Sequence, residues 1–129
     1  MHRVAYRASG GRIGARIWGL PIVLLTTTGR RSGEPRTTPL CVLPHGSDFV
    51  AIASFGGLDT PPWWWLNLQN DPRATIQLGR TRRRVTARTT SGDERDRLWA
   101  EVTARAPGYL GYARRTRREI PVVVLHPEG

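Results

Sequence analysis

Three strand-like segments follow one another between residues 21 and 54, and only short turns separate them. Residues 21–28 (PIVLLTTT) and 48–54 (DFVAIAS) are rich in β-branched or apolar side chains, which favour strands. Residues 37–43 form the middle segment, and Gly- and Pro-containing turns at 29–35 and 44–47 bound it. Short turns join antiparallel strands, whereas parallel strands need long crossovers, so this stretch predicts a β-meander.

The remainder of the chain adds three strands and three short helices. Helices are predicted at 63–70, after Pro62, at 91–105, where Ser91 and Glu94 have capping-box spacing, and in a short segment that begins at Pro107. Strands are predicted at 73–78, 82–89 and 120–126. The fold class is therefore α+β and mainly β, and six strands of meander type favour a small closed barrel over a parallel sheet.

The chain has 129 residues, which is enough for one ordinary domain. We divide it into a basic N-terminal arm or helix at residues 1–20 and a barrel domain at 21–129. The arm carries Arg3, Arg7, Arg12 and Arg16 and no acid. A frayed arm or a helix that caps the barrel is the preferred interpretation, and a helix with weak peripheral membrane contact is the alternative.

Residue usage excludes several chemistries. There is one cysteine, Cys41, and the three histidines are far apart, so neither a disulfide nor a metal cluster is expected. All 20 basic residues are arginine, and these side chains bind anions rather than shuttle protons. The net charge of +10 suits nucleic acid, an anionic membrane or an anionic small molecule.

No segment is predicted to span or cross a membrane. The apolar run at residues 17–25 is too short to span a bilayer, and no small-residue cleavage site follows it. We therefore expect a cytoplasmic protein.

Three segments are candidates for a functional site. The turn GRRSGEPR at 29–36 places three guanidinium groups beside a serine, which suits phosphate or carboxylate; a solvated hairpin tip is equally compatible. Residues 53–57 (ASFGG) precede the tryptophans of 63–65, which cannot all share one helix face, so at least one should border a groove or an interface. Tyr109 and Tyr112 share one side of a helix and could wall a pocket or simply pack.

No catalytic dyad accompanies these segments. The sequence has no nucleophile elbow, no G-x-G-x-x-G after a strand and no Walker sequence. If the chain is an enzyme, a bound cofactor must bring the reactivity.

Four segments together resemble the deazaflavin-dependent nitroreductase family, whose members use coenzyme F420. They are LLTTTGRRSGEPRTTPL (24–40), ASFGGLDTPPWWWLNLQNDP (53–72), SGDERDRLW (91–99) and PGYLGYARRTRREIPVVVLHP (107–127). The resemblance covers residues 21–127 and implies a six-stranded antiparallel split β-barrel with short peripheral helices. It also implies hydride transfer from reduced deazaflavin to an organic acceptor, such as a quinone or a nitroaromatic compound.

The same resemblance assigns roles to individual residues. Arg30, Arg31, Ser32 and Arg36 would hold the cofactor's phosphate and glutamate tail. The ring and its ribityl chain would lie beside Thr37, Thr38, Pro39, Ala53, Ser54, Gly56, Gly57 and Trp64, and Asn67, also counted with the cofactor site, would support the helix. Ser54 would orient or protonate the acceptor, and the family's acceptor-site tyrosines correspond to Tyr109 and Tyr112.

This chain departs from the family pattern at three positions. Arg31 stands where lysine is frequent, Cys41 where an aromatic residue is common, and Ala106 where a further tyrosine often precedes the proline. The acceptor pocket is therefore expected to differ more than the cofactor groove.

Other interpretations stay open at this point. They are a related barrel that binds flavin mononucleotide (FMN), a basic module that binds nucleic acid, and a cofactor carrier without turnover. We expect no specific nucleic-acid binding, because no known nucleic-acid-binding pattern occurs. A monomer and a homodimer are both compatible with the sequence.

Overall fold

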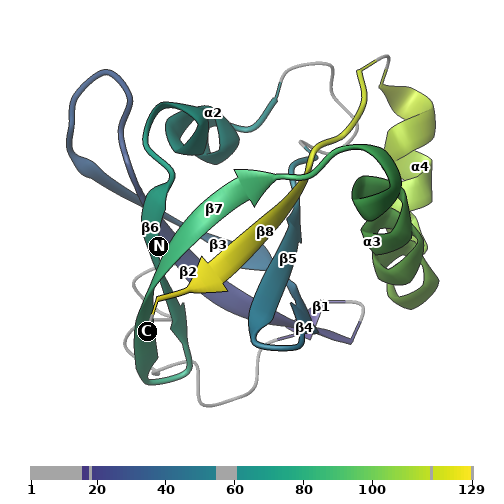
Figure 1. Cartoon of the computed structure of the whole chain (residues 1–129), viewed down its shortest axis with the longest axis horizontal. Helices are drawn as coiled ribbons and strands as arrows, with labels where there is room; N and C mark the ends of the chain where they lie inside the picture. The colour runs from purple at the N-terminus through teal and green to yellow at the C-terminus, as the bar shows by residue number, and fades with distance from the viewer. Residues whose placement is uncertain (1–15, 18, 55–60, 117, 129) are drawn as a thin grey trace.

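Eight antiparallel strands form one sheet in the part of the chain that the structure, a computed structural model, describes: residues 16–17, 19–54, 61–116 and 118–128 (Figure 1). The strands are β1 (Arg16–Ile17), β2 (Leu20–Thr28), β3 (Pro35–Cys41), β4 (Leu43–His45), β5 (Asp48–Ile52), β6 (Arg73–Leu78), β7 (Thr81–Thr89) and β8 (Val122–Pro127). The helices are α2 (Trp63–Asn70), α3 (Gly92–Arg105) and α4 (Gly108–Arg115). The prediction of a mainly antiparallel β fold with three short helices is confirmed.

The prediction of six strands was wrong, because seven longer strands and the two-residue β1 are present among the described residues. The segment predicted as one strand at 37–43 is divided at Val42, and β4 occupies part of the predicted turn at 44–47. Val42 is buried and donates its backbone N–H to the carbonyl of Pro21 at 3.0 Å. A buried valine suits a strand and a corner equally well, so nothing in the sequence signals this break.

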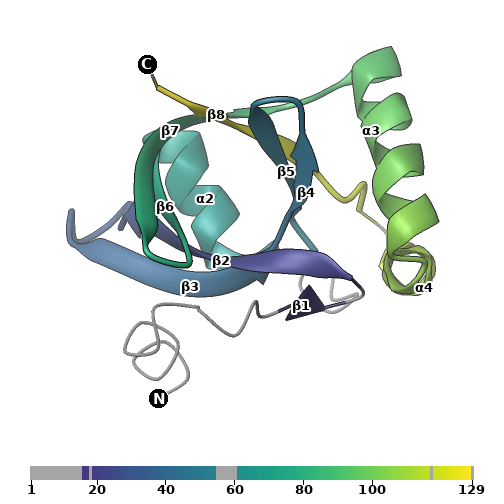
Figure 2. The ribbon, with the colours of Figure 1, turned by 90° about the horizontal axis from the view of Figure 1, so that it is seen from below.

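The corner at Val42 makes the sheet curl. β2 pairs with β3 and with β6, and the order then continues through β7, β8 and β5 to β4. β3 and β4 therefore lie at opposite ends of this order, yet only Val42 separates them in the chain. Figure 2 shows the resulting half-barrel, with α2 against the curled strands and α3 and α4 beside β5 and β8.

Two hydrophobic clusters lie on opposite faces of the sheet. The first joins Trp64 and Leu68 of α2 to inward-facing residues such as Val85. The second joins α3 and α4 to residues such as Val50 and Ile52. β8 serves both clusters, because Val123 and Leu125 belong to the first and Val122 and Val124 to the second. Burial on both faces explains why this strand is a continuous apolar run.

At the start of α3, the capping box predicts the position of the helix correctly but not the hydrogen bonds of its side chains. The helix begins after Ser91 as predicted, but the Ser91 side chain makes no capping hydrogen bond. Glu94 instead accepts two hydrogen bonds from the Arg88 guanidinium, at 2.7 and 2.8 Å. These bonds hold the pKa of the Glu94 carboxyl below its usual value.

The predicted N-terminal arm falls almost entirely outside the described residues. Leu20, the last residue of that arm, is buried and opens β2, so the sheet begins before the predicted domain boundary. Within the described ranges, no helix has the length and hydropathy needed to span a membrane.

The central position of β8 leads to a prediction about stability. We expect Leu125→Ala to lower the free energy of unfolding by about 2–5 kcal/mol, because its fully buried side chain would leave a cavity. Chemical denaturation followed by circular dichroism measures this loss. Leu110→Ala is the control, since Leu110 is 37% exposed and its truncation should have little effect. Equal losses in the two variants would contradict the assigned core.

Candidate functional site

The β2–β3 turn is closed by its own backbone. The N–H of Gly29 donates to the carbonyl of Glu34, and the N–H of Gly33 donates to the carbonyl of Gly29, both at 2.8 Å. Gly33 has a φ of 73°, a left-handed conformation that favours glycine. The N–H of Glu34 donates to Ser32 Oγ at 3.1 Å. The turn is therefore a defined structure and not a loose hairpin tip.

Gly29 has no room for a side chain in this turn. A Cβ atom at this position would lie 2.7 Å from Ser32 Oγ and 3.1 Å from the carbonyl oxygen of Glu34. Both atoms belong to the hydrogen-bonded closure of the turn. Any larger residue would therefore push Ser32 out of place.

A buried amide connects the turn to α2. The backbone N–H of Arg30 donates to Asn67 Oδ1 at 3.1 Å, and Asn67 Nδ2 donates to Thr27 Oγ1 at 3.0 Å. Asn67 and Thr27 are both buried. The sequence assigned Asn67 to supporting the helix, and the structure shows that it also fixes the end of β2 and the first residue of the turn.

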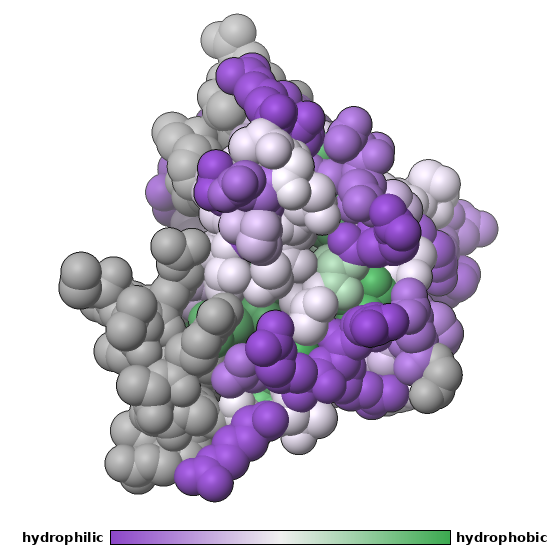
Figure 3. Space-filling model, turned by 90° about the vertical axis from the view of Figure 1, so that its left-hand side faces the viewer, coloured by the Kyte–Doolittle hydropathy of each residue, from purple (hydrophilic) through white to green (hydrophobic). Residues whose placement is uncertain are grey.

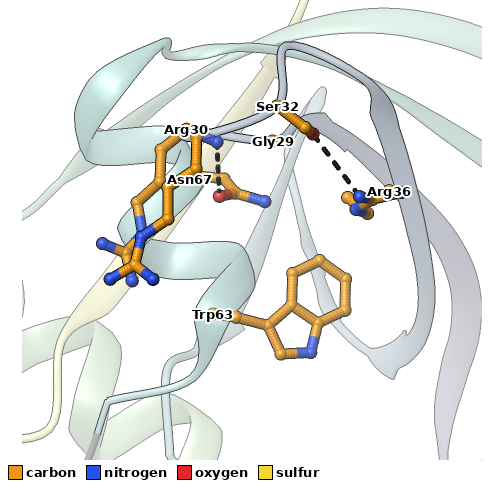
Figure 4. A pocket seen from close by; sticks show the side chains of 7 residues that line it. Gly29, Arg30, Ser32, Arg36, Trp63 and Asn67 are labelled. Carbon is orange, nitrogen blue, oxygen red and sulfur yellow. Dashed lines mark hydrogen bonds between the residues drawn. The ribbon is translucent and has the colours of Figure 1, made fainter.

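A pocket of about 410 Å³ lies between this turn and the start of α2 (Figure 4). It is lined by Gly29, Arg30, Arg31, Ser32, Arg36, Trp63 and Asn67. Figure 4 shows Arg30 and Arg36 on opposite sides, with the Trp63 indole between them. The structure therefore brings together four of the residues predicted to hold an anionic tail.

The donor set of the pocket suits an anionic ligand with a flat portion. Arg36 Nη2 lies 3.4 Å from Ser32 Oγ, and no described residue forms an ion pair with Arg30, Arg31 or Arg36. Forked guanidinium groups bind phosphate and carboxylate well. The exposed indole adds an apolar surface against which a ring or chain could lie.

The three consecutive tryptophans point in different directions, as predicted. Trp63 is 40% exposed and lines the pocket, whereas Trp64 is 7% exposed and packs in the α2 core. Trp65 Nε1 donates to Thr89 Oγ1 at 3.1 Å. The family resemblance assigns Trp64 to the neighbourhood of the ring, whereas Trp63, which lines this pocket, received no role from the sequence.

Thr37, Thr38 and Pro39 lie on β3, which runs away from the pocket. Thr37 Oγ1 is 2.8 Å from Thr26 Oγ1 on β2, and Thr38 Oγ1 lies 3.4 Å from the carbonyl of Pro39. Pro39 is exposed. These three residues therefore follow the arginine-lined turn directly along β3.

The end of β5 is held from two sides. Ala53 donates its N–H to the carbonyl of Pro121 at 2.9 Å, and its own carbonyl accepts from Arg118 Nη2 at 3.1 Å. Ala53 is buried and Ser54 is half-buried. Ser54 is therefore better placed than Ala53 to offer a polar group to a ligand. Gly56 and Gly57 lie outside the described residues.

Arg118 is a second residue that sequence reasoning missed. The run from 114 to 118 carries four arginines after a predicted helix, a pattern typical of a solvated face at a helix end. Arg118 is instead half-buried and reaches β5, 65 positions earlier in the chain. Four arginines in one short run look alike in sequence, so nothing there distinguishes the one that turns inward.

Tyr109 and Tyr112 lie in the second cluster, beside Cys41. Their rings meet edge to face, with centroids 5.8 Å apart. The Tyr109 hydroxyl lies 2.9 Å from Cys41 Sγ, and the Arg115 guanidinium stacks over the Tyr112 ring at 5.4 Å. Burial raises the pKa of the Tyr109 phenol well above its ordinary value, so this group keeps its proton at neutral pH. Tyr112 is half-buried and is the more accessible of the pair.

The described strands thus form a curled antiparallel sheet, and the pocket beside the β2–β3 turn is lined by arginine donors and an indole. Residues 1–127 match the family model described as F420H(2)-dependent quinone reductase. The chain belongs to this family, and is therefore an oxidoreductase that uses coenzyme F420.

Individual relatives agree with this assignment. The chain is 42% identical over 129 residues to an F420H(2)-dependent quinone reductase of Mycobacterium tuberculosis, covering 97% of this chain and 87% of that protein. A solved F420-H2 dependent reductase, FDR-A, matches with a TM-score of 0.75 and 36% identity, covering 82% of this chain and 94% of the other. A structure described as a domain-swapped dimer matches with a TM-score of 0.76 and 31% identity, covering 98% and 100%.

The buried amide of Asn67 leads to a prediction about the turn. We expect Asn67→Ala to lower the free energy of unfolding by about 1–3 kcal/mol, because Arg30 N–H and Thr27 Oγ1 lose their partner. Denaturant unfolding measures the loss. Gln69→Ala, on the exposed side of the same helix, is the control. A loss no larger than in the control would show that the turn does not depend on Asn67.

Proposed function

We propose that this chain transfers a hydride from reduced coenzyme F420 to a quinone, and that the pocket beside the β2–β3 turn holds the anionic tail of the cofactor. The observation that carries the proposal is the convergence of Arg30, Arg31 and Arg36 on one pocket, which Gly29 and Trp63 also line. Bound reduced deazaflavin supplies the hydride, and its phosphodiester and glutamate tail carry several negative charges. The protein supplies binding, orientation and stabilisation of charge.

In this proposal, the arginines of the turn contribute most of the free energy with which the anionic tail of the cofactor binds. Each charge-assisted hydrogen bond from a guanidinium to phosphate or carboxylate contributes about 1.5–3 kcal/mol. Arg31, where the family often has lysine, keeps the charge and adds a forked donor geometry. Asn67 holds the backbone from which Arg30 and Arg31 extend, so the guanidinium groups begin from a fixed turn.

The ring of the cofactor is assigned to the strand that leaves this turn. Along β3, the pocket is followed by Thr37, Thr38 and Pro39. In this proposal the ring lies beside these three residues, and Ser54 lies at the far end of the ring site. Ala53 contributes by packing, since its backbone groups already bond to Pro121 and Arg118. Trp64 supports the site from the core, and Trp63 borders the tail.

Ser54 and the two tyrosines are assigned to the acceptor side. The Ser54 hydroxyl can donate a hydrogen bond to the oxygen of the acceptor as negative charge develops there. Tyr112 can do the same from α4, and Tyr109 fixes the orientation of Tyr112 through its edge-to-face contact. Holding donor and acceptor in this way can contribute up to roughly 7–11 kcal/mol to lowering the barrier.

Three further features belong to the proposal. Nitroaromatic compounds are a second acceptor class in this proposal, as the resemblance to the nitroreductase family implies. Of the two oligomeric states left open, the relative described as a domain-swapped dimer favours a homodimer. We also retain the cytoplasm as the location, with the membrane contact of the N-terminal arm as an expectation for residues outside the described ranges.

The proposal is tested by mixing the protein with reduced F420 and menadione and following the cofactor's visible absorbance. We expect menadione-dependent oxidation of F420. Fluorescence titrations with F420 and with FMN, run in parallel, identify the cofactor. Tight binding of FMN without binding of F420 would overturn the assignment of the pocket.

Arg31 provides the sharpest test of the tail site. Arg31→Ala should raise the dissociation constant of F420 by at least about tenfold, because one charge-assisted contact is lost. The measurement is a fluorescence titration. Arg97→Ala is the matched control, since it removes an equal charge from the exposed face of α3. Unchanged affinity in Arg31→Ala would remove this residue from the site.

Ser54 is expected to act on turnover. Ser54→Ala should lower kcat for menadione reduction more than it weakens F420 binding, because its hydroxyl is assigned to the acceptor. Steady-state kinetics and the fluorescence titration separate the two effects. Ser47→Ala, in the exposed β4–β5 turn, should change neither. The opposite pattern would make Ser54 a cofactor-binding residue.

A further inference from the structure

The hairpin formed by β6 and β7 carries a concentrated positive charge that the reductase site does not use. Residues 73–84 contain five arginines and no acid. Four of them cluster at and just beyond the turn: Arg80, Arg82, Arg83 and Arg84. All four are exposed, and none forms an ion pair with a described residue.

The register places these guanidinium groups on both faces of the hairpin. Arg82 pairs with Gln77 and Arg84 with Thr75, and cross-strand partners share a face. Arg83 pairs with Ile76 on the opposite face, which is the face that enters the core. The arginines therefore surround the end of the hairpin instead of forming a stripe along one side.

The end of the hairpin is apolar at one point. Ile76 is buried, but Leu78, two residues further on the same face, is 39% exposed. The hairpin thus extends beyond the core and presents a leucine among arginines. Figure 3 shows the left-hand side of the molecule as drawn in Figure 1, on which strongly hydrophilic side chains surround paler and locally hydrophobic surface.

We propose that the β6–β7 hairpin docks the protein on an anionic phospholipid bilayer. Leu78 enters the boundary between headgroups and acyl chains, and the surrounding arginines bind lipid phosphates while their alkyl stems cover apolar surface. The argument is one of charge complementarity, because the cytoplasmic face of a membrane attracts basic segments of this kind. The proposal stands apart from the reductase activity, which no hairpin arginine is assigned to support.

A lipid surface fits this hairpin better than nucleic acid does. Residues 73–89 contain no aromatic side chain, so the hairpin has no platform on which bases could stack. A leucine at the end of the hairpin can bury its apolar side chain among acyl chains, whereas a phosphate backbone offers it no apolar surface. Because arginines lie on both faces, the end of the hairpin can insert between headgroups and contact lipid phosphates on either side.

The experiment is co-sedimentation of the full-length protein with vesicles of phosphatidylcholine, with and without phosphatidylglycerol. We expect binding that requires phosphatidylglycerol and weakens as salt is raised. The charge reversal Arg82→Glu with Arg84→Glu should lower the partition coefficient at least about tenfold. Leu78→Asp should also lower it, and should leave the dependence on salt in place.

Matched variants identify the surface responsible. Arg97→Glu with Arg105→Glu changes net charge equally on exposed positions of α3, and should retain most of the binding. Equal losses in the two double variants would overturn the proposal, because net charge alone would then explain binding. Loss only on reversing Arg3 and Arg7 would overturn it in favour of the N-terminal arm.

Further readouts keep the result independent of folding and of the proposed activity. Circular dichroism and chemical denaturation must show that the hairpin variants are folded. Binding to single-stranded DNA that exceeds vesicle binding, and that is lost in the Arg82 and Arg84 variant, would overturn the proposal in favour of nucleic acid. Because vesicle binding needs no turnover, failure of quinone reduction would not affect the interpretation.

Discussion

The amide of Asn67 is the interaction on which the proposed cofactor pocket depends. One side chain on α2 accepts a hydrogen bond from the backbone N–H of Arg30 in the β2–β3 turn and donates one to the buried hydroxyl of Thr27 near the end of β2. A helix, a strand end and a turn are thereby fixed relative to each other by a residue that is itself buried. The arginines of the turn are long and flexible, so their usefulness as a binding site rests on a backbone that does not move. Gly29 completes this arrangement, because the close approach of Ser32 and Glu34 leaves no space for a Cβ atom.

The sheet places this pocket by curling around α2. β2 is paired on both sides, to β3 and β6, and its buried residues hold α2 against the inside of the curl. The other end of the order, β5 and β4, returns to β3 through the corner at Val42. β5 and β3 thus belong to one curled sheet, although they lie at different points of its order. The clamp of Arg118 and Pro121 on Ala53 fixes the point at which β5 leaves the sheet.

The sequence was sufficient for the architecture where a local signal was strong, and insufficient where the deciding contact lay far along the chain. The β-branched runs predicted β2, β5, β6, β7 and β8, and the composition of the 29–36 turn predicted an anion site that the pocket geometry supports. The corner at Val42 was missed because no glycine or proline stands at that position and a buried valine suits a strand equally well. The position of Trp63 at the pocket depends on how α2 is rotated against the sheet, which a helix without a strong apolar face does not reveal. The inward turn of Arg118 depends on a carbonyl that lies on another strand.

The separation of the hydrophobic interior into two clusters has a consequence for how such an enzyme can diversify. The turn that is assigned to the electron donor rests on the cluster around α2, and the tyrosines assigned to the acceptor rest on the cluster around α3 and α4. Replacements on α4 that reshape the acceptor side fall in the second cluster, to which no residue of α2 is assigned among the described residues. The acceptor half of the molecule can therefore change while the other half continues to recognise the same reductant, and β5 and β8, whose two faces serve both halves, are the strands least able to change.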